Sequence, residues 1–307
     1  MSSKVTIHRL DTGVPGLNAI LGGGLPEFSF NLITGPPGSG KTTLAHQIMF
    51  ALATREKPAL FFNVLGEPPL KMLRYQQQFS FFDLDKLNDA VRFVNLSDDL
   101  ASGGLDQVLA RITQEVEASS PALVFVDSFR SVIQEAQQQT EGTFSMQLFI
   151  QQLGTQLSGW QATSFLIGEF LSERGSHPIL TVADGLLSLE QSVQRNSMVR
   201  KLQVVKMRGQ ATLPGMHTFR ISGDGIDAFP AVMVRGDTGD EPLNSGALRS
   251  KTRLTMGVPR LDEMLGGGLP SGYSLLVAGP SGSGKTILAT SFLAEGVRQG
   301  EPGVIVA

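Results

Sequence analysis

The stretch "GPPGSGKT", residues 35–42, decides the fold because it fits the phosphate-binding pattern G-x-x-x-x-G-K-[ST]. It follows "FNLIT" at 30–34, an apolar run typical of a strand, and precedes a helical segment expected at 42–54. In this setting the glycines let backbone N–H groups turn toward phosphate oxygens, and the helix N-terminus adds its positive dipole end. We therefore expect a nucleotide site formed by Gly35, Gly38, Ser39, Gly40, Lys41, Thr42 and Thr43.

Two side chains of this loop have a further task. Lys41 is expected to reach the β and γ phosphates, which makes it a candidate catalytic residue, and the hydroxyl of Thr42 is a candidate ligand for Mg²⁺. The cofactors that the loop predicts are therefore ATP and Mg²⁺.

Two acidic residues lie where such a site needs them. Asp127 ends the apolar run "PALVFVD", so its carboxylate is expected at the carboxyl edge of the sheet, beside the phosphates, as a Mg²⁺ ligand acting through water. Glu67 follows the next predicted strand after the loop and is a candidate for orienting the attacking water. A solvated strand-end aspartate and a loop glutamate without a catalytic task are the alternatives.

Apolar runs and helical stretches alternate over the first 235 residues. Strands are expected at 30–34, 59–64, 91–96, 122–127, 164–169 and 185–190, and helices at 42–54, 70–78, 105–118 and 144–159. Strands that are apolar on both faces and separated by helices indicate an α/β fold with a mainly parallel sheet covered on both sides. The later stretch from 200 to 229 alternates in hydropathy and predicts an antiparallel extension at one edge.

The phosphate-binding stretch returns near the end of the chain as "GPSGSGKT", residues 279–286. Aligning Arg9 with Arg253, an offset of 244, gives 23 identical positions among 55, including "GVP" and "LGGGLP" outside the loop. This predicts a duplicated module, with a complete copy at 1–235, a linker at 236–252 and the beginning of a second copy at 253–307. The second loop supplies further candidate nucleotide-binding residues: Gly279, Gly282, Ser283, Gly284, Lys285 and Thr286.

The second copy is far shorter than the first. No acidic strand end and no counterpart of the later strands follow its loop, so its apolar strands "YSLLVA" and "GVIVA" are expected to lack partners and to expose apolar faces. We expect residues 253–307 to be unstable alone, to bind nucleotide weakly if at all, and the chain to be a fragment or a truncated product.

Composition narrows the class of protein. The net charge is −3, without a block of like charge, which disfavours binding to nucleic acid or to an anionic membrane. Cysteine is absent, which excludes disulfides and thiolate sites, and the four histidines are scattered. The N-terminus lacks an apolar signal segment, so we expect a cytoplasmic protein without a membrane span.

Together, "GVPGLNAILGGGLP", the loop and their duplication resemble the KaiC-type branch of the RecA/DnaB superfamily. The resemblance implies a RecA-like fold, ATP bound between subunits of a homo-oligomeric hexameric ring, and clock-type or signalling protein partners. "VVKMRG" matches the family's K-x-R-G stretch, so Lys206 and Arg208 resemble the cations that reach the γ-phosphate of a neighbouring subunit. The family's paired glutamates fall on Leu65 and Gly66, with Glu67 one position later, so the loop must bulge for Glu67 to replace them.

Three alternatives to a slowly hydrolysing, partner-regulating ATPase remain open. A DNA-dependent motor of the same fold needs a basic inner surface, which this composition does not supply. A serine/threonine autokinase needs a complete second module. A nucleotide-gated scaffold without hydrolysis is the third alternative, and the displaced Glu67 supports it.

Overall fold

The computed structural model describes residues 7–64, 69–87, 89–127, 149, 152–157, 159–169, 179–231 and 252–306. The chain divides into two compact units, Met1–Val232 and Met233–Ala307.

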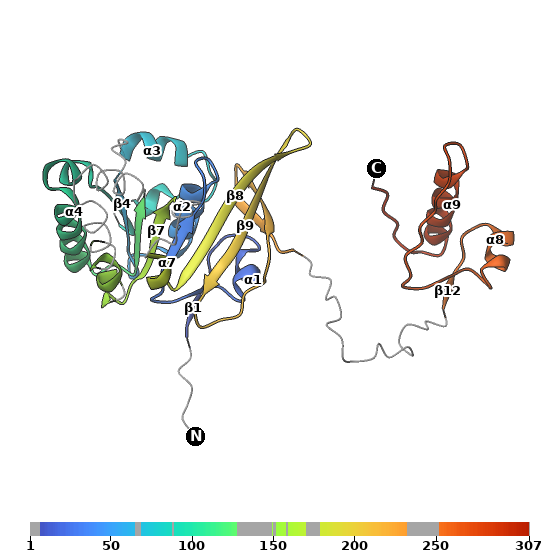
Figure 1. The fold of residues 1–307 in the computed structure, drawn as a ribbon, viewed down its shortest axis with the longest axis horizontal. Helices are drawn as coiled ribbons and strands as arrows, with labels where there is room; N and C mark the ends of the chain where they lie inside the picture. The colour runs from blue at the N-terminus through green and yellow to red at the C-terminus, as the bar shows by residue number, and fades with distance from the viewer. Residues whose placement is uncertain are drawn as a thin grey trace, which may run out of the picture. The chain divides into compact units, whose positions relative to one another are not determined.

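The first unit is built on a nine-stranded sheet (Figure 1). Its strand order is β11-β10-β9-β8-β3-β7-β6-β4-β5. The strands are β3 (Phe30–Thr34), β4 (Ala59–Asn63), β5 (Val91–Asn95), β6 (Leu123–Asp127), β7 (Thr163–Gly168), β8 (Gly185–Gln194), β9 (Ser197–Met207), β10 (His217–Ser222) and β11 (Gly225–Phe229). The pairs from β8 through β3, β7, β6 and β4 to β5 are parallel, whereas β8, β9, β10 and β11 pair antiparallel. The predicted α/β fold with an antiparallel extension is confirmed.

Helices cover both faces of this sheet because its central strands are apolar on both sides. The helices α1 (Leu17–Leu21) and α2 (Lys41–Leu52) pack on one face, in a core that contains Ile33, Phe61 and Phe125. On the other face, α4 (Ser97–Ser119) and the helical residues 152–157 pack against Phe30, Leu32 and Phe62. The other helical elements are α3 (Pro69–Gln76), η1 (Leu84–Lys86) and α7 (Ile179–Val182).

Helix α4 differs from its predicted range of 105–118. It begins at Ser97 and contains a kink at Gly104, whose φ of 64° is outside the helical region. The predicted range of 105–118 thus corresponds to the part of α4 that follows Gly104. The part before Gly104 was not predicted, because the glycine interrupts the helical hydropathy pattern. Of the helix predicted at 144–159, residues 149, 152–157 and 159 are described and are helical.

The first unit begins with a short two-stranded sheet that precedes the large sheet, and the second unit begins with an equivalent pair of strands. Strand β1 (Arg9–Leu10) pairs with β2 (Leu25–Pro26) so that Arg9 lies opposite Pro26. In the second unit β12 (Arg253–Leu254) pairs with β13 (Leu269–Pro270), and Arg253 lies opposite Pro270. The two strand pairs have the same register, and their residue numbers are related by the offset of 244 that aligns the two sequences.

The second unit contains the helices α8 (Pro259–Met264) and α9 (Lys285–Arg298). The apolar stretches 273–278 and 303–307 are predicted as strands, but residues 273–278 and 303–306 form no strand among the described residues of this unit. The stretches expose apolar side chains, as predicted, but they are not strands, because neither has a partner for its backbone hydrogen bonds among the described residues. Leu276 and Val306 are 89% and 92% exposed.

Within the described part of the chain, no helix is both long and apolar enough to cross a bilayer.

Candidate functional site

The phosphate-binding loop joins β3 to α2 at the carboxyl edge of the sheet. Gly40 caps α2 with a φ of 98°, a left-handed conformation that glycine adopts without strain. A Cβ atom on Gly35 would lie 2.1 Å from the carbonyl oxygen of Leu189 on β8. The glycines therefore allow both the turn into the helix and the close approach of β8.

Two side chains of the loop fit a phosphate ligand. Lys41 Nζ donates to the carbonyl oxygens of Gly35 and Pro36, at 2.8 and 2.9 Å, so the ammonium group is held over the loop. Ser39 is buried, and its hydroxyl has no hydrogen-bond partner among the residues that the structure describes. Because a buried hydroxyl is normally bonded, Ser39 is available to a ligand in the loop.

The centre of the site is a contact between Thr42 and Asp127. The hydroxyl of Thr42 donates to Asp127 Oδ2 at 2.6 Å. Asp127 is 7% exposed, and this burial raises the pKa of its carboxyl to about 6. The hydrogen bond from Thr42 and the charge of Lys41 act in the opposite direction and lower that pKa. A hydroxyl and a carboxylate oxygen are the ligand types that Mg²⁺ prefers, so these two residues fit a Mg²⁺ ion that a bound nucleotide would bring.

A hollow of about 280 Å³ lies beside the loop. Its lining includes Gly35, Pro36, Pro37 and Glu169. Glu169 follows β7, the strand between β3 and β6, so it shares the carboxyl edge with Asp127. Glu169 is a site residue that was not predicted from the sequence, because it ends an apolar run without a recognisable motif.

The loop is also braced by β8. Gln191 Nε2 donates to the carbonyl oxygen of Pro37 at 2.9 Å. No sequence signal marked Gln191, because the contact depends on how far β8 extends past the loop. Glu67, the predicted water-orienting residue, lies outside the described residues.

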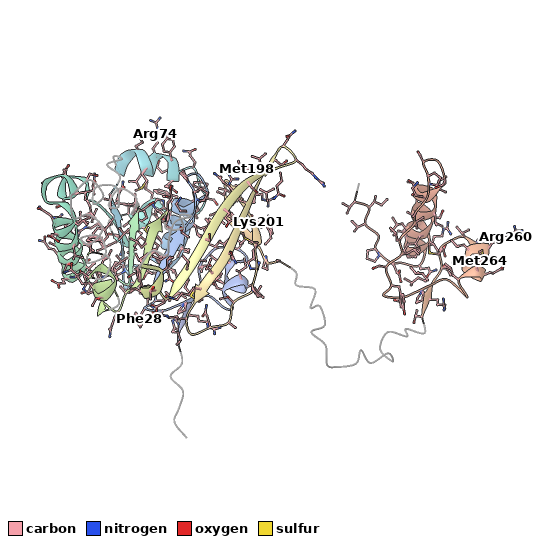
Figure 2. All side chains as sticks on the ribbon, in the orientation of Figure 1. Phe28, Arg74, Met198, Lys201, Arg260 and Met264 are labelled. Carbon is pink, nitrogen blue, oxygen red and sulfur yellow. The ribbon has the colours of Figure 1, made fainter. Side chains whose placement is uncertain are left out.

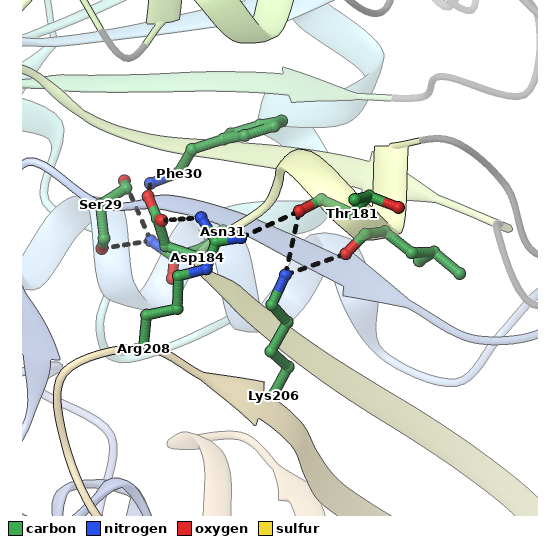
Figure 3. A network of polar contacts seen from close by, with 8 residues as sticks. Ser29, Phe30, Asn31, Thr181, Asp184, Lys206 and Arg208 are labelled. Atoms are coloured by element: carbon green, nitrogen blue, oxygen red, sulfur yellow. Dashed lines mark hydrogen bonds and ion pairs between the residues drawn. The ribbon is translucent and has the colours of Figure 1, made fainter.

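The two cations predicted to act between subunits, Lys206 and Arg208, form a separate network (Figure 3). Lys206 Nζ donates to the carbonyl oxygens of Leu180 and Thr181 at 3.0 and 3.2 Å. Arg208 donates to the carbonyl oxygen of Thr181 at 3.1 Å and to Asp184 Oδ1 at 3.2 Å. Burial, followed by the charge of Arg208, lowers the pKa of Lys206, while Asp184 opposes the shift.

This network lies toward the opposite edge of the sheet from the loop. Lys206 pairs with Leu186, and Leu186 pairs with Leu32 in the middle of β3. The chain leaves the other end of β3 at Thr34 to form the loop. The first unit thus brings its seven loop residues together with Asp127, but it does not bring Lys206 and Arg208 to them.

The second loop repeats the local geometry of the first. Lys285 Nζ donates to the carbonyl oxygens of Gly279 and Pro280 at 2.9 and 2.7 Å, and Gly282 and Gly284 have positive φ. Ser283 precedes Gly284, the cap of α9. Among residues 252–306 of the described chain, however, the contact of Thr42 with Asp127 has no counterpart at the hydroxyl of Thr286. The loop is present without the acidic partner that Thr42 has.

A phosphate-binding loop between a central parallel strand and a helix defines a P-loop nucleotide-binding protein. The family model described as "ATPase: KaiC" matches residues 10–232 and again 254–307. The chain therefore belongs to the KaiC ATPase family, as its sequence motifs indicated.

Individual relatives agree with this assignment. The chain is 30% identical to a circadian clock oscillator protein KaiC of Rippkaea orientalis, over 98% of this chain and 57% of the relative. It is 29% identical to that of Picosynechococcus, over 98% of this chain and 58% of the relative. The chain thus spans little more than half the length of these curated relatives. The crystal structure of a KaiC-like protein from Pyrococcus horikoshii OT3 superposes with a TM-score of 0.63 at 25% identity, covering 73% of this chain and 100% of that one.

Proposed function

We propose that the chain binds ATP with Mg²⁺ at residues 35–43 and hydrolyses it slowly, as a ring-forming ATPase that regulates protein partners. The observation that carries this proposal is the 2.6 Å contact between Thr42 and Asp127, beside the ammonium group of Lys41. In this site Lys41 neutralises phosphate charge, while Thr42 and Asp127 hold Mg²⁺, which supplies electrostatic stabilisation when it is bound.

Hydrolysis also needs a group that orients water and a cation at the γ-phosphate. We assign the first task to Glu67 and the second to Lys206 and Arg208 of a neighbouring subunit. The register of β3, β8 and β9 supports the second assignment, because this pair lies away from its own loop. A donated arginine contributes roughly 10³ to 10⁵ in rate in GTPases. Isolated subunits should therefore bind ATP but hydrolyse it poorly.

The family resemblance supports a hexameric homo-oligomer, protein partners and a cytoplasmic location. We also infer that residues 1–235 form one module, that 236–252 link it to the next, and that 253–307 begin a second one. The two separate matches of the same family model, and the shared register of the first strand pair in each unit, support this division. In the second module the loop is proposed to bind nucleotide weakly if at all, because within residues 252–306 as described no acidic partner contacts the Thr286 hydroxyl. Its residues are Gly279, Gly282, Ser283, Gly284, Lys285 and Thr286.

ATP turnover measured against oligomeric state tests the proposal. Phosphate release by the full chain should require Mg²⁺ and should rise as subunits assemble, and it should be unaffected by DNA. Asp127→Asn should lower turnover while ATP still binds, because the substitution removes a charge from the Mg²⁺ site. Stimulation by single-stranded DNA would favour the DNA-dependent motor, and tight ATP binding without phosphate release would favour the scaffold.

A further inference from the structure

We propose that Asp184 is a positioning residue that holds Lys206 and Arg208 in the orientation they need to reach the nucleotide of a neighbouring subunit. This inference rests on the proposed action of the pair between subunits. Asp184 lies between α7 and β8, one residue before β8 begins, and it occupies the centre of the network in Figure 3.

Asp184 makes four hydrogen bonds, two with Phe30 on β3 and two with Arg208, the residue after β9. Its backbone N–H donates to the carbonyl oxygen of Phe30 at 2.8 Å, and its Oδ2 accepts the Phe30 N–H at 3.0 Å. Its backbone carbonyl oxygen accepts the N–H of Arg208 at 2.9 Å, and its Oδ1 accepts from the Arg208 guanidinium at 3.2 Å. One carboxylate is therefore fixed by β3 on one side and directs the Arg208 side chain on the other.

The two cations need a negative partner at this place. The carbonyl oxygen of Thr181 accepts hydrogen bonds from both Lys206 and Arg208, so their positive charges lie close together at the end of α7. Among the contacts described for this network, Asp184 supplies the negative charge. Removing that charge leaves the two cations with helix carbonyls alone, and repulsion then favours other rotamers of Arg208.

The contribution of Asp184 is to orientation more than to stability. The side chains of Arg208 and Asp184 are 57% and 31% exposed, and ion pairs of such exposure contribute about 0–1 kcal/mol to folding. Misplacing a catalytic cation by about 1 Å, in contrast, can lower a rate on the order of 10²-fold. A substitution at Asp184 should therefore reduce turnover far more than stability.

Asp227 offers a matched control on β11. Its carboxylate pairs with Arg220 at 3.6 Å and is 30% exposed, close to the exposure of Asp184. Asp184→Asn should lower kcat at least about tenfold with KM changed less than about twofold, because a transition-state interaction is lost while binding is kept. Asp227→Asn should change neither constant. Unaltered kcat in Asp184→Asn overturns the proposal, and so does loss of ATP binding, which would place the effect at the subunit's own loop.

Mixed assemblies distinguish an effect on a neighbour from an effect within the subunit. Lys41→Ala disables the loop but keeps the cationic pair, whereas Arg208→Ala disables the pair but keeps the loop. Co-expressed at equal amounts, they should recover about a quarter of wild-type turnover, since intact loops meet intact pairs at random around a ring. Lys41→Ala mixed with Asp184→Asn should recover a similar share if Asp184 acts through Arg208.

The two mixtures separate the possible failures. Recovery with Arg208→Ala but not with Asp184→Asn keeps the action between subunits and overturns the role of Asp184. Recovery in neither mixture overturns the action between subunits, and the role of Asp184 with it.

Discussion

The hydroxyl of Thr42 and the carboxylate of Asp127 lie 2.6 Å apart, although 85 residues separate them in the sequence. Thr42 belongs to the first turn of α2, and Asp127 is the last residue of β6. Strand β7 lies between β6 and β3, so the contact crosses the carboxyl edge of three strands. The sheet thereby joins the phosphate loop to an acidic group that the loop itself does not contain.

The burial of Asp127 makes folding stability depend on pH. Its pKa rises from 3.8 in the ordinary case to about 6, so between these pH values the folded chain keeps a proton that the unfolded chain has lost. The contribution of Asp127 to the free energy of unfolding should therefore fall as the pH rises from 4 to 6, by up to about 3 kcal/mol, and stay level above pH 6. Asp127→Asn should lose this dependence in urea unfolding without nucleotide. Equal slopes in variant and wild type would contradict the raised pKa.

His46 on α2 should produce the opposite slope. It is fully buried between Phe61 and Phe93, with ring centroids at 4.5 and 5.9 Å, and burial lowers its pKa from 6.5 to about 4. The unfolded chain then binds a proton first as the pH falls, so stability should be lost between pH 6.5 and 4 by up to about 3 kcal/mol. His46→Leu should remove this loss and reveal the slope of Asp127. If the wild type and His46→Leu lost the same stability on acidification, the lowered pKa of His46 would be contradicted.

The parts of the fold that the sequence could predict are those with local signals. The run from β3 through the loop into α2 combines a strand, glycines and a helix start within 23 residues of sequence, 30–52, and Asp127 ends an apolar strand. The sheet order needed the family resemblance, because periodicity does not say which strands pair.

The surroundings of Lys206 could not be predicted from the sequence. Leu186 pairs with Lys206, but Leu187 pairs with Val204, so Val205 is an extra residue in β9. Such a bulge changes which face of the sheet the following side chains occupy, and no residue type marks it. For the same reason the contacts of Lys206 and Arg208 follow only from the register of the β8–β9 hairpin, whereas the Gln191 contact follows from how far β8 extends beside β3 and past the loop.

The two loop lysines provide a matched test of the two nucleotide sites. Their ammonium groups make equivalent hydrogen bonds to loop carbonyl oxygens, and among the described residues an acidic partner is found for Thr42 but not for Thr286. Lys41→Ala should weaken ATP binding by about 10- to 100-fold, the value of one or two charged hydrogen bonds. Lys285→Ala should leave both affinity and stoichiometry unchanged in calorimetric titration. Tight, stoichiometric binding by Lys41→Ala would show that the second loop is a full site.

Glu67 and Glu169 are two candidates for orienting the attacking water. Glu67 matches the family's glutamates with a shift of one position, whereas Glu169 lines the hollow beside Gly35. We expect Glu67→Gln to lower kcat by about 10²- to 10⁴-fold without weakening ATP binding, the usual effect of losing a general base. Glu169→Gln should lower kcat much less. Single-turnover measurements compare them, and the reverse ranking would transfer the role to Glu169.

The left-handed backbone at Phe28 should favour glycine over alanine at this position. It has a φ of 61° and is 54% exposed at the edge of the first unit (Figure 2), while the aligned position in the second unit is Gly272, with a φ of 86°. A left-handed conformation costs a side chain about 1–2 kcal/mol, which glycine avoids. Phe28→Gly should therefore be more stable than Phe28→Ala by about 1 kcal/mol, although glycine is ordinarily the less stable of the two. Thermal unfolding of both variants measures this difference, and alanine proving the more stable would show that the backbone at Phe28 is not strained.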